Sequence, residues 1–246
     1  MKTINIGWLY PDLMSTYGDR GNIITLSYRL KKRDIRPVVH KISVNEPKEL
    51  ISEMDIIFMG GAQDKQQKIV NIDLKNNKGK YLINAIENDV PSLFVCGAYQ
   101  FLGKYYKAAD GTIISGLGAF DLYTENPGID FPRCIGNVII KTRLFPKIKL
   151  VGFENHGGRT YLADKKLAFA QVIKGFGNNG EDKTEGIFYK NSFGTYLHGP
   201  ILPKNPELVD YLIKKAIERK YRKDVKLKKL NNKWENIARD YVISKL

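Results

Sequence analysis

Apolar runs alternate with amphipathic stretches along the first hundred residues of the chain. Short runs rich in Ile, Val, Leu and Phe are typical of buried strands, and apolar residues at helical spacing lie between them. The pattern predicts strands at 3–10, 37–42, 54–59 and 92–95 and helices at 22–32 and 81–88. Strands that alternate with helices favour an α/β fold, in which helices cover both faces of a mainly parallel sheet.

Beyond residue 112 the pattern changes to short β-like segments separated by turns. It predicts strands at 134–141, 149–154, 168–173, 186–189 and 193–197, then helices at 206–220 and around 234–243. No internal repeat or low-complexity linker divides the chain. We therefore expect one domain over 1–246 that ends in a basic helical segment from about 221 to 246.

Size and composition favour a globular protein. The chain has 246 residues, of which 43% are hydrophobic, so disorder is not expected. Its two cysteines are too few for a disulfide scaffold. No apolar stretch approaches the roughly 20 residues that a membrane-spanning helix needs, and the N-terminus resembles a first strand rather than a leader. These features predict a cytoplasmic protein without a transmembrane segment.

The formal net charge of +14 is concentrated at the C-terminal end. Residues 214–246 hold twelve Lys and Arg against four Asp and Glu. Such a segment can bind nucleic acid, anionic lipid or an acidic partner, or it can be a solvated helix face. No zinc-finger, RNA-recognition or helix-turn-helix pattern accompanies the charge, so we do not predict nucleic-acid binding.

The most informative candidate for chemistry is Cys96. It follows the predicted strand at 92–95 directly, and Gly97 and a predicted helix come next. This is the layout of a nucleophile elbow, and the nearby helix N-terminus favours a thiolate. His198 occupies a second strand-then-turn setting, so the two residues could form a Cys-His pair for acyl transfer. Cys134 has no such setting and is expected to be a structural cysteine.

Other residues could complete this centre. The backbone of Gly60 and Gly61, which follow the apolar run 54–59, could form an oxyanion hole with the N–H of Gly97. His156 is a rival histidine in a loop-like context, where it could contact substrate or hold a loop.

A third group normally orients a catalytic histidine. No acid lies between His198 and Glu207, so the orienting carboxylate comes from elsewhere in the fold, comes from another chain, or is missing.

Residues 175–180 fit the pattern G-x-G-x-x-G and nearly fit a phosphate-binding loop. Glu181 occupies the position of the loop lysine, and an acidic stretch leads into another predicted strand rather than a helix. We interpret this segment as a turn between strands and predict no nucleotide site there.

The elbow Val95-Cys96-Gly97-Ala98-Tyr99-Gln100-Phe101-Leu102-Gly103 resembles the class I glutamine amidotransferases, in the branch that contains cobyric acid synthase. Together with 60–61, 152–161 and 194–205, the match narrows to the glutaminase subunits of lipid II isoglutaminyl synthases. It covers most of the chain and informs the segment beyond Tyr221 least. The resemblance implies a flavodoxin-like α/β fold with a mainly parallel sheet flanked by helices.

The resemblance also implies roles for single residues. Cys96 would attack the side-chain amide of L-glutamine, and His198 would move the proton. Gly61 and Gly97 would stabilise the oxyanion. Gln100 and Arg133 would contact the substrate, and Arg133 would hold its α-carboxylate. We add His156 to the substrate-binding residues because of its loop-like context. No metal site is implied.

The implied reaction hydrolyses L-glutamine to glutamate and ammonia through a γ-glutamyl thioester. Ammonia would pass to a MurT-like, Mur-ligase-related partner subunit that uses ATP and Mg²⁺ to amidate the D-glutamate of lipid II to D-isoglutamine. This chain would need no cofactor of its own. Through that complex, the protein could reach the inner face of the plasma membrane.

Three alternatives remain open at this point. The same Cys-His centre could belong to a stand-alone hydrolase of γ-glutamyl compounds. It could also serve an amidotransferase with another acceptor, such as a cobyrinate-type corrinoid. A third hypothesis is a non-catalytic basic binding protein built on the same fold.

Overall fold

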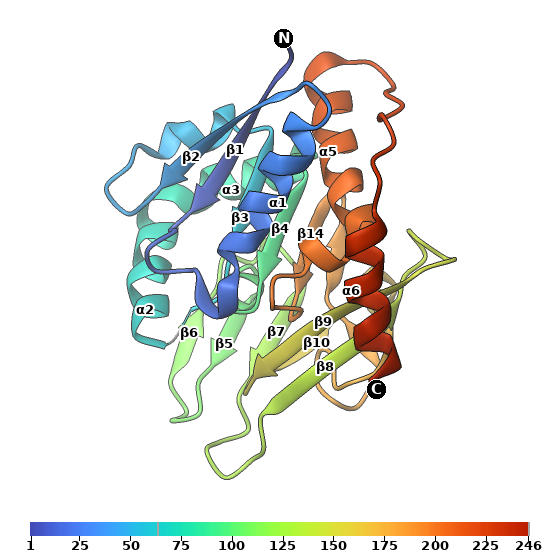
Figure 1. Cartoon of the computed structure of the whole chain (residues 1–246). Coiled ribbons are helices and arrows are strands. Elements are labelled where there is room, and N and C mark those ends of the chain that lie inside the picture. The colour runs from blue at the N-terminus through green and yellow to red at the C-terminus, as the bar shows by residue number, and fades with distance from the viewer. Residues whose placement is uncertain (63, 246) are drawn as a thin grey trace.

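The strands of the central sheet follow the order β13-β14-β4-β3-β1-β2 (Figure 1). The computed structural model describes residues 1–62 and 64–245. The strands of this sheet are β1 (Thr3–Leu9), β2 (Arg36–Ile42), β3 (Ile56–Met59), β4 (Ser92–Val95), β13 (Ile187–Tyr189) and β14 (Ser192–Thr195). All neighbours pair in parallel except β13, which pairs antiparallel with β14 at the edge. The predicted mainly parallel α/β sheet is confirmed.

Helices cover both faces of this sheet. The described helices are α1 (Arg20–Lys31), α2 (Asp64–Asp73), α3 (Gly79–Glu87), α4 (Gly97–Phe101), α5 (Pro206–Tyr221) and α6 (Lys233–Ser244), with a π-helical turn at Leu74–Lys78 between α2 and α3. Short 3-10 turns are η1 (Thr16–Gly18), η2 (Lys48–Glu53), η4 (Lys165–Leu167) and η5 (Leu202–Lys204). The last helix, α6, packs instead on β9 (Lys149–His156) and η5. Among the described residues, no helix combines the length and apolar character that crossing a bilayer requires.

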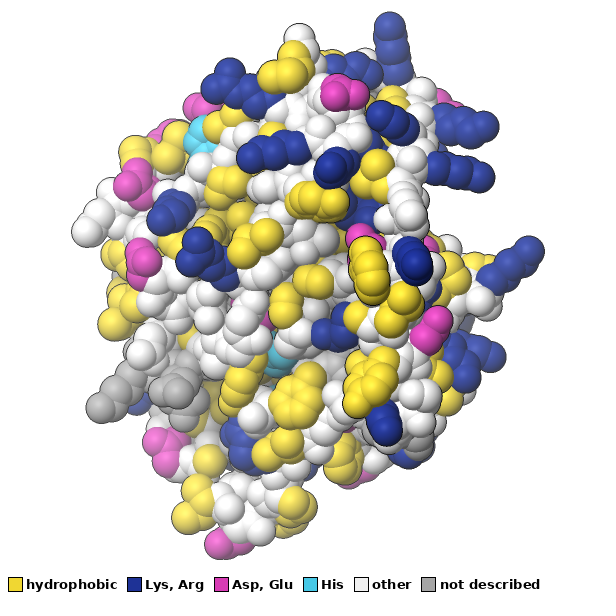
Figure 2. Space-filling model, in the orientation of Figure 1, with side chains coloured by type: hydrophobic (Ala, Val, Ile, Leu, Met, Phe, Trp, Pro, Cys, Tyr) yellow, Lys and Arg dark blue, Asp and Glu magenta, His cyan; other side chains and the backbone are white. Residues whose placement is uncertain are grey.

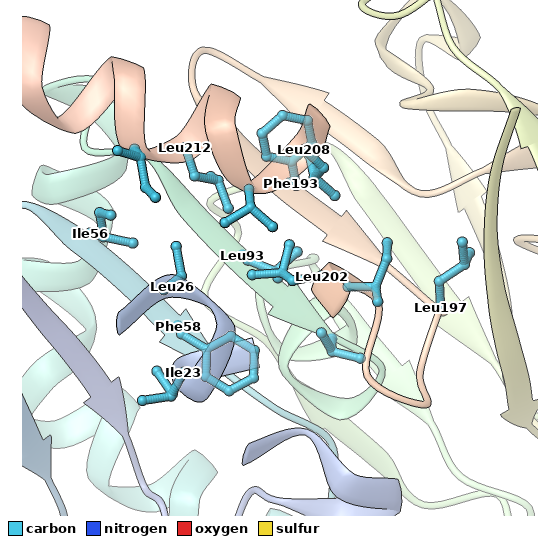
Figure 3. Packing of buried hydrophobic residues seen from close by; sticks show 14 of the residues in the cluster. Ile23, Leu26, Ile56, Phe58, Leu93, Phe193, Leu197, Leu202, Leu208 and Leu212 are labelled. Atoms are coloured by element: carbon cyan, nitrogen blue, oxygen red, sulfur yellow. The ribbon is translucent and has the colours of Figure 1, made fainter. Parts of the chain in front are cut away.

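Alternate residues of the central strands point into two different cores. In β3, Ile56 and Phe58 pack with the apolar faces of α1 and α5, whereas Ile57 and Met59 pack with those of α2 and α3. Figure 3 shows the first core, in which side chains of α1 and α5 meet those of β3, β4 and β14. Because both faces are buried, the strand is apolar at every position, which is why its sequence shows no alternation.

Two smaller sheets fill the segment between β4 and β13. One has the order β10-β7-β5-β6 and the other the order β12-β11-β8-β9. Their strands are β5 (Tyr105–Lys107), β6 (Ile113–Ser115), β7 (Leu122–Glu125), β8 (Cys134–Lys141), β9 (Lys149–His156), β10 (Arg159–Leu162), β11 (Ala170–Lys174) and β12 (Thr184–Glu185). The antiparallel pair β8–β9 confirms the predicted strands at 134–141 and 149–154.

Some elements escaped the sequence analysis. Helix α2 has the polar sequence DKQQKIVNID, with Val70 its only fully buried apolar residue, so it carries little helical periodicity. The strands β5, β6 and β7 have three or four residues each, too few for an alternation to stand out.

The sheet order decides where the candidate residues meet. The neighbours β14, β4, β3 and β1 are parallel, so their carboxyl ends lie at one edge of the sheet. The loops that leave these ends carry His198, Cys96, Gly61 and the segment that contains Asp19. Ligand sites of open parallel sheets form at such an edge.

The buried Asn205 joins the loop after His198 to β9, in the sheet with the order β12-β11-β8-β9. Its carbonyl oxygen accepts from Val151 N at 3.0 Å, and its Nδ2 donates to the carbonyl oxygens of Val151 (2.8 Å) and Ile201 (2.6 Å). The side chain thus satisfies both backbone groups of a residue in β9. Each of these groups would be buried without a partner if the amide were removed.

We expect Asn205→Ala to lower the free energy of unfolding by about 2–4 kcal/mol, because two or more buried polar groups lose their partners. Urea denaturation followed by circular dichroism measures this change. The exposed Asn137 in β8 provides the control, and Asn137→Ala should change stability by less than about 0.5 kcal/mol. Equal costs for the two variants would contradict this account of Asn205.

Candidate active site

Cys96 lies between β4 and α4 in a conformation that is rare for a residue with a side chain. Its φ is 52° and its ψ −106°, and α4 begins at the next residue, Gly97. The strand–cysteine–helix layout of the predicted elbow is therefore present. The backbone N–H of Cys96 donates to Thr195 O at 2.8 Å, which fastens the turn to β14. As the first residue of α4, Gly97 has an N–H without an acceptor inside the helix.

Gly61 lies between Cys96 and His198. A Cβ atom on Gly61 would be 3.3 Å from Cys96 Cβ, 2.8 Å from His198 Cε1 and 3.5 Å from His198 Nε2. The thiol-bearing carbon and the imidazole therefore flank one glycine, and a side chain there would separate them. The structure brings together the two residues that the sequence analysis paired.

Two backbone hydrogen bonds fix the position of His198. Its N–H donates to Phe153 O at 2.7 Å, and its carbonyl accepts from Phe153 N at 3.1 Å. The side chain is fully buried, and its Nε2 has no hydrogen-bond partner among the described residues. This nitrogen is therefore free to exchange a proton with a reacting group.

The group that orients His198 is Asp19. Its Oδ1 lies 3.2 Å from His198 Nδ1, and both side chains are completely buried. The fold itself, one of the three sources left open by the sequence, therefore places a carboxylate beside His198. Sequence reasoning missed Asp19 because the loop after the first strand also contains Asp12, and no local pattern separates the two acids.

Asp19 also changes the role of Gly61. Its Oδ2 accepts from Gly61 N at 2.8 Å, so this N–H points at the carboxylate. The hydrogen bond contradicts the prediction that the amide of Gly61 stabilises an oxyanion. The Gly61 carbonyl accepts from Thr16 N (3.2 Å) and Oγ1 (2.9 Å), which ties η1 to the same peptide. Gly61 thus positions Asp19 and η1.

The charges around His198 favour its protonated form. Burial by itself lowers the pKa of the imidazole. The electrostatic interaction with the neighbouring Cys96 and the hydrogen bond with Asp19 outweigh it and raise the pKa to about 10. The raised pKa favours the imidazolium, the form that can donate a proton to a leaving group.

A buried carboxyl group binds the end of β14, just before His198. The fully buried Glu185 accepts from Thr195 Oγ1 at 2.5 Å and from Tyr196 N at 2.9 Å. Burial raises the pKa of Glu185 to about 8, although these hydrogen bonds act in the opposite direction. Glu185 is thus mostly uncharged at neutral pH and fixes the segment that precedes His198.

A cavity of about 560 Å³ opens above Cys96 and His198. This volume is within the usual range for small-molecule sites. The predicted substrate residues Gln100, Arg133 and His156 all line it. Tyr17 of η1, which is 46% exposed, lies at the cavity with its ring edge-on to His198, 5.1 Å between centroids.

Arg133 is the only Lys or Arg among the described residues that line this cavity. Its Nε donates to Asn155 Oδ1 and its Nη2 to Asn155 O, both at 3.0 Å. Gln100 is buried and donates from Nε2 to Tyr196 OH at 3.1 Å. The cavity therefore offers a guanidinium held by Asn155, which suits a substrate with a carboxylate.

His156 forms a wall of the cavity. Its ring stacks on Tyr196 with 3.6 Å between centroids, and its Nδ1 lies 2.7 Å from Gly158 O. Burial lowers its pKa, and the neighbouring Glu154 offsets part of this effect. His156 is therefore a neutral, fixed ring. Of the two candidate histidines, His198 is the one beside Gly61 and Cys96.

The remaining motifs are structural. Cys134 is buried, and burial raises the pKa of its thiol to about 11, so it stays protonated at neutral pH. Residues 175–180 form a turn between β11 and β12, where the N–H groups of Phe176 and Gly177 donate to Glu154. No cluster of metal-ligating side chains occurs in the part of the chain that the structure describes.

Comparisons with known proteins agree with this geometry. The model of the CobB/CobQ-like glutamine amidotransferase domain matches residues 5–206. Among solved structures, a glutamine amidotransferase superposes with a TM-score of 0.58 at 12% identity, over 86% of this chain and 98% of that one. The glutaminase domain of Trypanosoma brucei CTPS, with bound acivicin, gives 0.53 at 10% identity over 92% and 96%. These likenesses show the fold.

Sequence relatives are much closer. The lipid II isoglutaminyl synthase (glutamine-hydrolyzing) subunit GatD of Staphylococcus aureus (strain N315) is 48% identical over 89% of this chain and 87% of its own length. The protein of the same name from Streptococcus pneumoniae (strain ATCC BAA-255 / R6) is 42% identical over 91% and 84%. A probable cobyric acid synthase of Methanococcus maripaludis is 32% identical over 68% of this chain and 34% of its own. The chain therefore belongs to the CobB/CobQ-like glutamine amidotransferase family, in the branch that contains the GatD subunits.

Proposed function

We propose that this protein is the glutaminase subunit of a lipid II isoglutaminyl synthase. The observation that carries the proposal is the hydrogen bond between the buried side chains of Asp19 and His198, beside Cys96. Cys96 and His198 line a cavity in which Arg133 is the only described Lys or Arg. The names of the two GatD relatives support the choice of lipid II as the final acceptor.

The first half-reaction forms a thioester. The α-carboxylate of L-glutamine pairs with Arg133, and its side-chain amide reaches Cys96. The thiolate attacks the amide carbon, and the N–H of Gly97 stabilises the oxyanion. The His198 imidazolium gives its proton to the nitrogen, the C–N bond breaks, and ammonia leaves. The γ-glutamyl group remains on Cys96 as a thioester.

The second half-reaction restores the enzyme. His198, now neutral, takes a proton from a water molecule that attacks the thioester carbonyl. Glutamate leaves, and the thiolate and imidazolium form again. Asp19 keeps the Nδ1–H of His198 in place throughout, so Nε2 is the nitrogen that releases and takes up the proton.

Ammonia then serves a second subunit. Hydrolysis of glutamine does not activate an acceptor carboxylate, so amide synthesis needs a partner that spends ATP. We propose a MurT-like, Mur-ligase-related partner that binds ATP and Mg²⁺ and activates the D-glutamate α-carboxylate of lipid II. A stand-alone γ-glutamyl hydrolase is the competing function, and partner-independent turnover of such compounds would favour it.

Cys96→Ala should reduce glutamate release to background when glutamine, ATP, Mg²⁺, lipid II and the ligase subunit are all present. A coupled glutamate assay measures the release, and mass spectrometry measures the amidation of lipid II. Cys134→Ala is the matched control and should keep activity, because its thiol is buried outside the cavity. The proposal fails if the wild-type pair releases no glutamate.

Asp19→Asn should lower kcat/KM for glutamine by about a hundredfold or more. The amide has no negative charge to raise the pKa of His198, so this pKa falls below about 10. His198 then loses its proton at lower pH, and the alkaline limb of the kcat/KM profile moves down. The exposed Asp12 provides the control Asp12→Asn. Superimposable pH profiles of the wild type and Asp19→Asn would contradict the role assigned to Asp19.

Arg133→Met should raise KM for glutamine by roughly tenfold to a hundredfold, because a charge-assisted hydrogen bond to the α-carboxylate contributes about 1.5–3 kcal/mol. We expect little change in kcat, since Arg133 holds a part of the substrate that does not react. The exposed Lys107→Met is the control for a lost surface charge. An unchanged KM in steady-state kinetics would remove Arg133 from the site.

A further inference from the structure

Helix α6 forms ion pairs with the protein on its inner side and exposes three large apolar side chains to solvent. Trp234, Ile237 and Tyr241 are 74%, 49% and 63% exposed, and they recur at the spacing of one helix face. Two of its four charged residues, Glu235 and Arg239, point inward, whereas Lys233 and Asp240 are exposed. Surface helices normally have the opposite arrangement. Figure 2 shows apolar side chains along α6, with Lys and Arg side chains above them.

Ion pairs hold α6 in this orientation. Arg29 of α1, which is 1% exposed, contacts Glu235 at 3.3 Å and donates to Asn232 Oδ1 at 3.0 Å. The Arg239 guanidinium lies 2.6 Å from the carboxylate of Glu207 in α5. The inward side of α6 is therefore specified by charge pairs with two other helices, and the apolar face points outward as a consequence.

The surroundings of this face are basic. From 222 to 245, seven Lys and Arg are exposed against two exposed acids, Asp224 and Asp240. Trp and Tyr are the residues that most often dominate the binding energy of protein interfaces. A face of this kind fits a partner surface with an apolar groove and an acidic rim.

The position of α6 points to the partner that consumes ammonia. The helix packs against β9 and η5. β9 carries Asn155 and His156 of the cavity, and η5 follows His198 in the chain. The helix also lies outside residues 5–206, the part that matches the family domain. A protein docked on α6 would cover the helix that packs on these two elements of the cavity region.

We propose that the apolar face of α6, formed by Trp234, Ile237 and Tyr241, docks the ATP-dependent ligase subunit through an acidic, apolar-grooved surface of that subunit. This inference rests on the proposed function for the identity of the partner. It places the ligase over α6, on the side of the helix that faces away from β9 and η5.

The test is the dissociation constant of the full-length pair, measured by isothermal titration calorimetry without substrates. Trp234→Ala and Tyr241→Ala should each raise Kd at least tenfold, and the double variant Lys228→Glu/Lys229→Glu should weaken binding most at low salt. Ile113→Ala is the matched control, because Ile113 is 65% exposed on β6 and is not part of α6. Thermal unfolding and the rate of Cys96 alkylation should be unchanged, which separates docking from folding.

Each other outcome is decisive. If Trp234→Ala and Ile113→Ala bind the ligase subunit as the wild type does, the inference is wrong. It is equally wrong if Trp234→Ala leaves Kd unchanged but abolishes sedimentation with phosphatidylglycerol vesicles, because α6 would then bind lipid. If binding depends on Trp234 but the pair releases no glutamate, the docking surface stands and the proposed function fails.

Discussion

The site depends on one buried carboxylate. Asp19 precedes α1, Gly61 follows β3 and His198 follows β14, and the two oxygens of Asp19 join the other two residues. A carboxylate that is fully buried loses its hydration, and only partners with strong hydrogen bonds or opposite charge can offset that cost. Gly61 N–H and the His198 imidazolium are these partners, so the positions of three loops are coupled at one point.

The same coupling reaches the nucleophile. Cys96 has a positive φ, a conformation that costs about 1–3 kcal/mol for such a residue and persists only where the surrounding structure enforces it. Its N–H is held by Thr195, whose hydroxyl is held by the buried Glu185. Thr195 and Glu185 therefore support both the elbow at Cys96 and the segment before His198. They can do so because β4 and β14 are neighbouring parallel strands.

The sequence predicted the parts of the site that have a local pattern. Cys96 stands between a strand and a glycine, and His198 stands in a second strand-then-turn segment, so both could be found and paired. Asp19 could not be found, because its role arises from the neighbourhood of β1 and β3 in space. For the same reason the Gly61 amide was assigned to an oxyanion, when Asp19 takes its hydrogen bond.

The elements of the fold also differ in how well the sequence predicted them. Strands buried on both faces and helices with a clear apolar side were predicted within a few residues, as β1, β4 and α5 show. The polar helix α2 and the short strands β5 to β7 lack a pattern of their own. They are stabilised by contacts that form only after the chain has folded, which no local reading of residues reveals.

The central claim is that Asp19 and Cys96 hold His198 as an imidazolium at neutral pH. Nitrogen-15 NMR of the His198 ring, titrated in the wild-type protein, tests it most directly. The account predicts a ring protonated at both nitrogens at pH 7 that titrates near pH 10, with the Nδ1 proton in a hydrogen bond. A neutral ring at pH 7, titrating near the ordinary histidine value of about 6.5, would contradict it.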